Sequence, residues 1–381
     1  MSEKRILLAS LLKPVNDTRM FEKLGLSICK LNQLQVHIAG FNSLVPAHSP
    51  TNISFYPVFN FKRLSTGRLK AQHTYWKLLL AVKPHLIIVC THELLPVTVL
   101  YKKRYKCKII YDIQENYTLN LLSQGHYANG IRQLLATGIS VVEKLSSKTI
   151  DHFLLAERSY AQELPFTRGK ATIIENKFKP AVNYTYPYTP VKVSPSNLKL
   201  LYTGTIAKLF GIFEAIALAD KLFLQSQRIS LTIIGYCASS ETLSDLYAAI
   251  KGKPYITLIG GDKLVPHQQI LEAMKTHDIG LMPYRYNKST HNCIPTKLYE
   301  YIALGVPVII QKNPLWHDLI RKYNTGISTD YNKINISELI PILLKSSFYQ
   351  NGIPNEVFWN TEEQKLLTVI GDFLPITDLK I

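Results

Sequence analysis

Short apolar runs alternate along the chain with segments whose apolar residues recur at helical spacing. In the first half, residues 5–10, 35–41, 86–90, 108–111, 151–155 and 171–175 predict strands. Helices are predicted at residues 17–31, 69–82 and 119–148, with one more between 90 and 108. The runs 86–90 and 108–111 are almost uninterrupted, which is typical of strands in a parallel sheet that helices cover on both faces.

The same alternation restarts in the second half of the chain. Strands are predicted at residues 198–202, 230–234, 256–258, 278–282 and 308–310, and helices at 211–224, 240–250, 295–304 and 314–322. Residues 177–197 are rich in Pro, Tyr, Val and Lys and show neither periodicity, which predicts a linker.

This organisation predicts an α/β protein of two Rossmann-like, doubly wound parallel-sheet domains that face each other across a cleft. The expected parts are a first domain at 1–176, the linker at 177–197, a second domain at 198–350 and a C-terminal segment at 351–381. In such sheets ligands bind outside the carboxyl ends of the strands. We therefore look for the functional residues in the turns that follow strands.

Composition adds a prediction of where the protein resides. No stretch approaches the roughly 20 uncharged apolar residues of a spanning helix, and the N-terminus runs directly into the first predicted strand. The five cysteines are scattered singly, without the spacing of a zinc or disulfide framework. We expect a soluble cytoplasmic protein whose cysteines are reduced.

The net charge of +17 is concentrated in the first half. Residues 1–180 carry 25 Lys and Arg against 11 Asp and Glu, a net charge of +14, whereas the remainder has a net charge of +3. Nucleic acid is not the expected partner, because zinc-finger spacing and aromatic RNA-binding signatures are missing from the sequence. An anionic membrane surface, on the inner face of the cytoplasmic membrane, fits better. The alternative is solvated charge on ordinary helices.

Clusters of basic residues indicate which parts of the protein would contact an anionic membrane. They are Lys62 with Arg63, Arg68 with Lys70, and the run at 102–106. Each basic residue near an anionic leaflet adds about 1 kcal/mol of attraction.

The stretch PTKLYEYIALGVPVI at residues 295–309 carries the most specific chemistry. Pro295 suits the first turn of a helix, and Gly305 with Pro307 ends it before a buried strand. The start of that helix is a natural phosphate site, to which Lys297 adds a full charge. Glu300, one turn on, can accept hydrogen bonds from ribose hydroxyls. The simpler interpretation is an amphipathic helix with one exposed Lys and one exposed Glu.

The stretch resembles the C-terminal signature of GT-B glycosyltransferases of the large retaining family (glycosyltransferase group 1, family 4-like) that makes bacterial surface polysaccharides. The resemblance covers nearly the full chain: YTGTIAKLFG at 202–211 resembles the family's glycine loop, and the segments 233–235, 258–261, 265–266 and 278–283 follow in order. The donor-binding residues that it implies are Gly204, Thr205, Lys208, Gly235, Gly260, Gly261, Asn292, Lys297, Leu298 and Glu300.

In the first half, PVNDTR at 14–19 resembles the family's acceptor-side loop, which implies roles for Asn16, Asp17 and Arg19. A capped helix start would explain the same residues. The catalytic candidates stand at predicted strand ends and are His92, Asp112, Gln114 and Glu115. Asn176 matches the asparagine before the hinge, and residues 358–363 resemble the segment that crosses back onto the first domain.

Some positions depart from the family pattern. Asn292 stands where an earlier glutamate is usual, Thr205 and Phe210 where the glycine loop usually supplies Arg and Lys, and Gln114 where many members have His. Lys208 and Lys297 remain as the nearest cations. An Asp-x-Asp metal motif is missing from the sequence, and the resemblance implies neither a metal nor a cofactor, with a nucleoside diphosphate sugar as donor substrate.

The sequence thus predicts a hexosyltransferase, retaining by resemblance, that acts on a saccharide or lipid-linked acceptor. Two alternatives stay open. One is a degenerate relative that binds nucleotides without transfer, because of the four departures. The other is a nucleotide-sugar epimerase, which can share the two-domain architecture.

Overall fold

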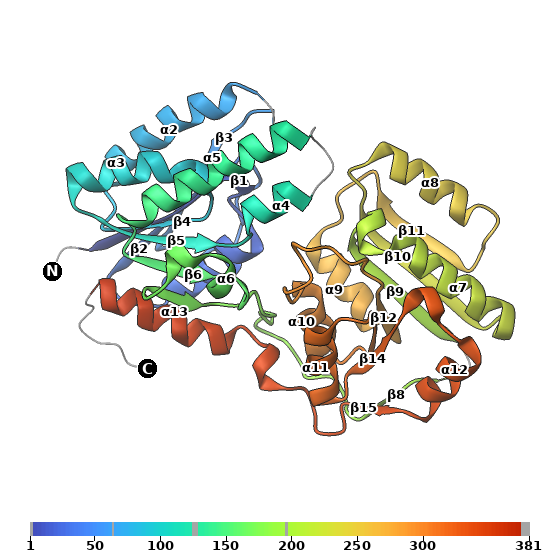
Figure 1. The fold of residues 1–381 in the computed structure, drawn as a ribbon. Coiled ribbons are helices and arrows are strands. Elements are labelled where there is room, and N and C mark those ends of the chain that lie inside the picture. Colours follow the sequence, from blue (N-terminus) through green and yellow to red (C-terminus); the bar gives the residue numbers. More distant parts are fainter. Residues whose placement is uncertain (1–2, 63–64, 124–128, 195–196, 375–381) are drawn as a thin grey trace. The chain divides into compact units, whose positions relative to one another are not determined.

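The computed structural model describes residues 3–62, 65–123, 129–194 and 197–374. The chain divides into two compact units, one formed by Met1–Lys179 with Trp359–Ile381 and the other by Pro180–Phe358. Figure 1 shows that each is built on its own sheet with helices packed against it. The expected α/β class with two Rossmann-like parallel-sheet domains is confirmed.

The first unit contains a seven-stranded parallel sheet in the order β3-β2-β1-β4-β5-β6-β7. Its strands are β1 (Lys4–Pro14), β2 (Leu34–Phe41), β3 (Ile53–Phe59), β4 (Leu86–Val89), β5 (Lys108–Ile113), β6 (His152–Leu155) and β7 (Ala171–Ile173). The sequence did not predict β3, an edge strand that contains Pro57 and is largely half-buried, so it lacks a continuous apolar run. Strand order reverses between β1 and β4, which makes their carboxyl ends the topological switch point.

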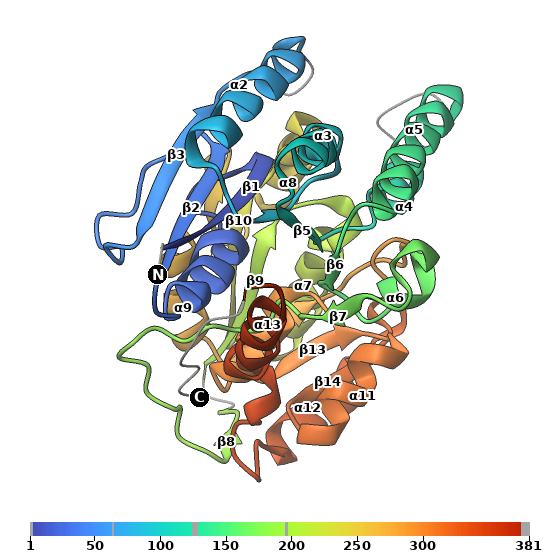
Figure 2. The ribbon, with the colours of Figure 1, turned by 90° about the vertical axis from the view of Figure 1, so that its left-hand side faces the viewer.

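The handedness of the connections between strands determines which face of the sheet each helix of this unit covers. The helices are π-helical η1 (Thr18–Gly25), α1 (Leu26–Ile28), α2 (Gly67–Val82), α3 (Leu95–Tyr105), α4 (Tyr117–Ser123), α5 (Asn129–Ser147) and α6 (Tyr160–Glu163), with 3-10 turns η2 (His92–Leu94) and η3 (Pro165–Thr167). The crossovers β3→β4, β4→β5 and β5→β6 run the same way, so right-handed connections put α2, α3 and α5 on one face (Figure 2). The single helix expected at 119–148 is two, α4 and α5, with residues 124–128 outside the described part.

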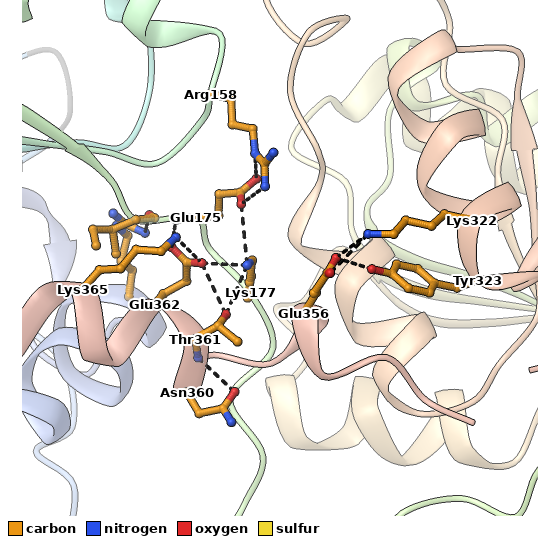
Figure 3. Close-up of polar contacts among 12 residues, drawn as sticks. Arg158, Glu175, Lys177, Lys322, Tyr323, Glu356, Asn360, Thr361, Glu362 and Lys365 are labelled. Carbon is orange, nitrogen blue, oxygen red and sulfur yellow. Dashed lines mark hydrogen bonds and ion pairs between the residues drawn. The ribbon is translucent and has the colours of Figure 1, made fainter. Parts of the chain in front are cut away.

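The end of the chain returns to the first unit. Helix α13 (Asn360–Phe373) places Leu366, Val369 and Ile370 in the same core cluster as Ile6 of β1. Glu362 of α13 is fully buried and forms an ion pair with Lys177 at 2.6 Å (Figure 3). Its other oxygen accepts a hydrogen bond from the backbone N–H of residue 175 at 3.0 Å. These contacts fix α13 on the first domain.

The second unit contains a six-stranded parallel sheet in the order β11-β10-β9-β12-β13-β14. Its strands are β9 (Leu198–Thr205), β10 (Ile229–Tyr236), β11 (Ile256–Gly261), β12 (Ile279–Met282), β13 (Val308–Gln311) and β14 (Gly326–Thr329), and a small antiparallel pair joins β8 (Val191–Lys192) to β15 (Ser347–Phe348). All five strands expected here are present. Strand β14 was missed because its four residues are only half-buried and include Gly326.

Helices of the second unit alternate with these strands. They are α7 (Ile212–Ser226), α8 (Ser240–Ile250), α9 (His267–Lys275), α10 (Thr296–Ala303), α11 (Pro314–Tyr323) and α12 (Ile336–Lys345), with 3-10 turns η4 (Lys208–Phe210), η5 (Tyr331–Lys333) and η6 (Asn355–Val357). The sequence did not predict α9 or α12. Near the end of this unit, Glu356 forms an ion pair with Lys322 of α11 at 3.0 Å and accepts a hydrogen bond from Tyr323 (Figure 3).

None of the helices in the described part of the chain is long and apolar enough to cross a membrane. All five cysteines are unpaired.

Candidate functional site

Three adjacent strands of the second domain end on glycines that lie in register. Gly235 of β10 pairs with Gly204 of β9 on one side and with Gly260 of β11 on the other. A Cβ on Gly235 would lie 1.7 Å from the carbonyl oxygen of Gly204, and Gly204 itself has a φ of +89°. Only glycine fits both positions without strain, so the carboxyl edge of this sheet presents bare backbone that a ligand can approach closely.

Lys297 reaches this glycine edge from the first turn of α10. Its Nζ donates a hydrogen bond to the carbonyl oxygen of Thr203 at 2.5 Å and lies 2.9 Å from where a Cβ of Gly204 would stand. The ammonium also lies over two rings, 5.7 Å from the centroid of Tyr202 and 5.3 Å from that of Tyr284. The structure therefore brings together Gly204 and Lys297, which are 93 positions apart and which the sequence assigns to one ligand.

Burial changes the chemistry of the Lys297 ammonium. Desolvation lowers its pKa to about 8, and the nearby carboxylate of Glu300 opposes the shift only in part. The positive end of the α10 dipole lies at the same place, because the helix begins at Thr296. Pro295 caps this helix without a side-chain hydrogen bond. An anion bound here would meet both the dipole and the ammonium in surroundings of low polarity.

Glu300, one turn along α10, is 7% exposed and is paired with a residue that the sequence did not single out. Its Oε1 lies 2.8 Å from Nε2 of His267, the first residue of α9. This contact holds the carboxylate in one orientation and leaves Oε2 as the acceptor for a ligand hydroxyl. No sequence signal points to His267, because the pairing joins residues of two different helices that are 33 positions apart.

Other residues expected at the donor site differ in their availability. Thr205 and Asn292 are exposed, whereas Lys208 forms ion pairs with Glu241 at 3.0 Å and Asp245 at 2.8 Å. Leu298 is less available than expected, because its side chain is fully buried and its N–H donates to the carbonyl oxygen of Pro295.

A pocket of about 70 Å³ lies at the ends of β12 and β13. Its lining includes Tyr284, Arg285, His291, Lys312 and Trp316, but neither Lys297 nor Glu300. We take the glycine edge and Lys297 as the candidate phosphate-binding site, because those groups have the chemistry that a diphosphate requires. The pocket borders that site through Tyr284.

In the first domain, Arg19 and Asp112 form a buried ion pair. The Arg19 guanidinium donates to both oxygens of Asp112, with the shortest contact 2.6 Å, and also to the carbonyl oxygen of Ile174 at 2.9 Å. Their side chains are 3% and 0% exposed. Both side chains are closed off from solvent in this structure, which favours a positioning role between β5 and η1 over the expected catalytic role of Asp112 and acceptor-binding role of Arg19.

Of the remaining residues of the acceptor-side loop, Asp17 has the capping role of the simpler interpretation. Asp17 caps η1, accepting hydrogen bonds from the N–H groups of Arg19 at 3.0 Å and Met20 at 2.9 Å. Asn16 is exposed, and its Oδ1 accepts a hydrogen bond from Ser43.

The turn after β4 and the start of α2 carry buried polar atoms that lack hydrogen bonds. His92 Nδ1, Glu93 Oε2 and Arg68 Nε are buried and have no hydrogen-bond partner among the described residues. The nearest ionic contacts are long, 3.5 Å from Arg68 to Glu93 and 3.7 Å from Glu93 to His92. Unsatisfied buried groups are costly, which makes this turn a place where a polar ligand would be stabilised.

Burial lowers the pKa of His92, with Arg68 acting in the same direction and Glu93 opposing it. The imidazole is therefore neutral at neutral pH and able to accept a proton. Of the other catalytic candidates, Gln114 donates to Asp112 at 2.9 Å, and Glu115 accepts from Asn120 at 2.9 Å. Both are half-buried.

Part of the chain matches a described protein family. Residues 191–354 match the family model described as glycosyl transferases group 1. The match covers most of the second unit and less than half of the chain. A search of curated proteins finds no match to the chain.

Solved structures extend the similarity beyond the glycosyl transferase domain to the whole chain. Sucrose-phosphate synthase from Thermosynechococcus elongatus is 13% identical with a TM-score of 0.72, and the match covers 98% of this chain and 100% of that one. HepE of Anabaena in complex with UDP-glucose is 13% identical with a TM-score of 0.59, over 97% and 99% of the two chains. A putative UDP-N-acetylglucosamine 2-epimerase from Listeria monocytogenes is 11% identical with a TM-score of 0.61, over 99% and 98%. The chain has the GT-B fold.

The matched glycosyl transferase domain contains the whole glycine edge, Lys297, Glu300 and His267. Within the described residues, no group of three or more His, Cys, Asp or Glu side chains is arranged to hold a metal ion.

The pKa of Lys297 predicts how donor binding depends on pH. An anionic diphosphate binds the protonated ammonium, so affinity for a nucleoside diphosphate at this site should be constant below pH about 8 and fall above it, by up to about tenfold per pH unit. Calorimetric titration across this range measures the effect. Lys297→Arg is the control, because its guanidinium stays charged and its affinity should remain flat. The same fall in both proteins would assign the titration to another group.

Proposed function

We propose that the chain transfers a hexosyl group, with retention, from a nucleoside diphosphate sugar to a saccharide or lipid-linked acceptor in bacterial surface polysaccharide synthesis. The observation that carries the proposal is the contact of Lys297 with the Gly204 edge at the start of α10, inside a group 1 glycosyl transferase domain. A half-buried cation, a helix N-terminus and bare backbone together suit a diphosphate leaving group.

The donor residues then have separate tasks. Lys297 and the α10 dipole stabilise the charge that develops on the departing diphosphate, and Glu300, held by His267, accepts hydrogen bonds from the ribose. Asn292, which is exposed, faces the donor sugar. Lys208 supplies a second cation only after it leaves Glu241 and Asp245, and exposed ion pairs of that kind are weak enough to exchange.

The first domain supplies the acceptor side. The unsatisfied atoms of Arg68, His92 and Glu93 offer both donors and acceptors, which matches the hydroxyl groups of a saccharide. Gln114 and Glu115 stand at the end of the neighbouring strand β5. In retaining transfer the departing phosphate can take the acceptor proton, so the reaction does not require a strong enzymic base.

A lipid-linked acceptor would be met at the cytoplasmic face of a membrane. The net charge of +14 on residues 1–180 favours an anionic surface as the partner, and the protein would then act as a peripheral membrane enzyme.

A second candidate is a nucleotide-binding protein without transfer activity. One observation favours it: Lys208 is occupied by two carboxylates while Thr205 and Phe210 supply no charge, which leaves Lys297 as the cation at the glycine edge. A nucleotide-sugar epimerase is a weaker third candidate, because the similarity to the Listeria protein is one of fold.

Analysis of the reaction products distinguishes the three candidate functions. The purified chain is incubated with UDP-, GDP- and ADP-sugars, with and without a bacterial lipid extract, and products are identified by mass spectrometry. Transfer predicts a glycosylated lipid or saccharide together with free nucleoside diphosphate, dependent on the extract. An epimerised sugar without any acceptor would indicate the epimerase, and binding without product would indicate the inactive relative.

A further inference from the structure

Helix α5 of the first domain has its apolar side outward. The exposed fractions are 52% for Ile131, 74% for Leu134, 43% for Leu135, 47% for Val141 and 66% for Leu145. At about 100° per residue these five positions fall within an arc of about 120° on the helix. An ordinary surface helix buries such a stripe against its own core.

The side of α5 that packs inward is small and polar instead. Its buried residues are Ala136, Glu143, Ser146 and Ser147. Glu143 accepts a hydrogen bond from Tyr111 of β5 at 2.8 Å, so polar groups hold the helix to the sheet. The exposed apolar stripe is therefore not explained by the core of this domain.

The neighbouring helices extend the same surface. Helix α3 lies between α2 and α5 on one face of the sheet, and α2 and α3 add Leu69, Leu100 and Tyr105, which are 75%, 57% and 45% exposed (Figures 1 and 2). We call the outer side of these three helices the α2–α3–α5 face. Several large apolar side chains exposed on one face of a domain are typical of an interaction surface.

The charge on this face has one sign. The three helices carry eight Lys or Arg and one acidic residue, Glu143, which is buried. The exposed cations include Lys70, Lys77, Lys103, Arg104 and Lys144. The surface thus combines apolar side chains that can enter a hydrocarbon boundary with cations that attract anions.

We propose that the α2–α3–α5 face binds an anionic lipid bilayer, with the apolar stripe of α5 inserted among the lipids. A second copy of the chain fits less well, because two such faces would bring like charges together. Nucleic acid would use the cations but leave the leucines of α5 without a partner. The proposal rests on the membrane part of the proposed function and is independent of sugar transfer.

Vesicle binding by the full chain tests the proposal without donor or acceptor, so a lack of transfer activity does not affect the result. Co-sedimentation is measured with phosphatidylcholine vesicles alone and with added phosphatidylglycerol, at low and high salt. We expect binding only with the anionic lipid, and weakening by salt. Leu134→Glu should lower the partition coefficient at least about tenfold, and Lys103→Glu about fivefold or more. Leu224→Glu, at a residue 82% exposed on α7 of the second domain, is the matched control and should bind like the wild type.

Insertion is measured separately from surface attraction. A tryptophan introduced by Leu134→Trp should be quenched by lipids brominated in their acyl chains, whereas one introduced by Leu224→Trp should not. Equal vesicle binding by Leu134→Glu and Leu224→Glu would overturn the proposal. So would a dimer that Leu134→Glu converts to monomer with vesicle binding unchanged, or nucleic-acid binding by a chain that ignores anionic vesicles.

Discussion

Replacing Lys297 by alanine is expected to lower kcat for sugar transfer by about 100- to 1,000-fold, equivalent to about 2.7 to 4 kcal/mol of transition-state stabilisation. The ammonium is fixed at the glycine edge by Thr203 and lies where charge would develop on a departing diphosphate. Its low-polarity surroundings make the interaction stronger than a solvent-exposed contact. Steady-state kinetics with saturating acceptor measure the change.

The control for this variant is Lys275→Ala, which removes an exposed lysine from α9 in the same domain and should leave kcat unchanged. Lys297→Arg should retain part of the activity because it preserves the charge, although its geometry differs. If Lys297→Ala stayed within about twofold of the wild type, the diphosphate would have to bind elsewhere.

Replacing Arg19 by alanine is expected to lower the free energy of unfolding by about 3 to 5 kcal/mol. The change leaves Asp112 as a fully buried carboxylate without its cation and removes the donor to the carbonyl oxygen of Ile174. The loss comes mainly from the unpaired buried charge. Urea denaturation followed by circular dichroism measures it.

Two comparisons make the Arg19 result specific. Arg321→Ala breaks an exposed ion pair with Asp318 at 3.9 Å, whose side chains are 74% and 72% exposed, and should change stability by less than about 1 kcal/mol. Removing both charges with Arg19→Met and Asp112→Leu should restore much of the loss, because no buried charge is then unpaired. A double variant as unstable as Arg19→Ala would contradict this explanation.

The sequence predicted the elements whose signal is local. Strands β4 and β5 are continuous apolar runs, and α10 has both a start signal and a stop signal. The edge strands β3 and β14 were missed because half-buried strands lack such runs. Helices with weak local signals, such as α9, depend on packing that periodicity does not contain.

The residues of the candidate site also divide into those with a local sequence signal and those without one. Gly204 and Lys297 lie in motifs that can be recognised in the sequence, and the structure brings them together. The pairing of Arg19 with Asp112 spans 93 residues, and that of His267 with Glu300 joins two helices, so neither could be read from spacing. The pattern of α5 predicted a helix but not that its apolar side would face outward.

Thermal unfolding with a panel of ligands tests the central claim most directly. The purified protein is heated with UDP, GDP and ADP and with their sugar conjugates, since a ligand at about 100 times its Kd stabilises by about 2.7 kcal/mol. Our account predicts a rise in Tm with one base only, and loss of that rise in Lys297→Ala. Absence of any shift at high ligand concentration, or an equal shift in Lys297→Ala, would contradict a nucleotide-sugar site at the glycine edge.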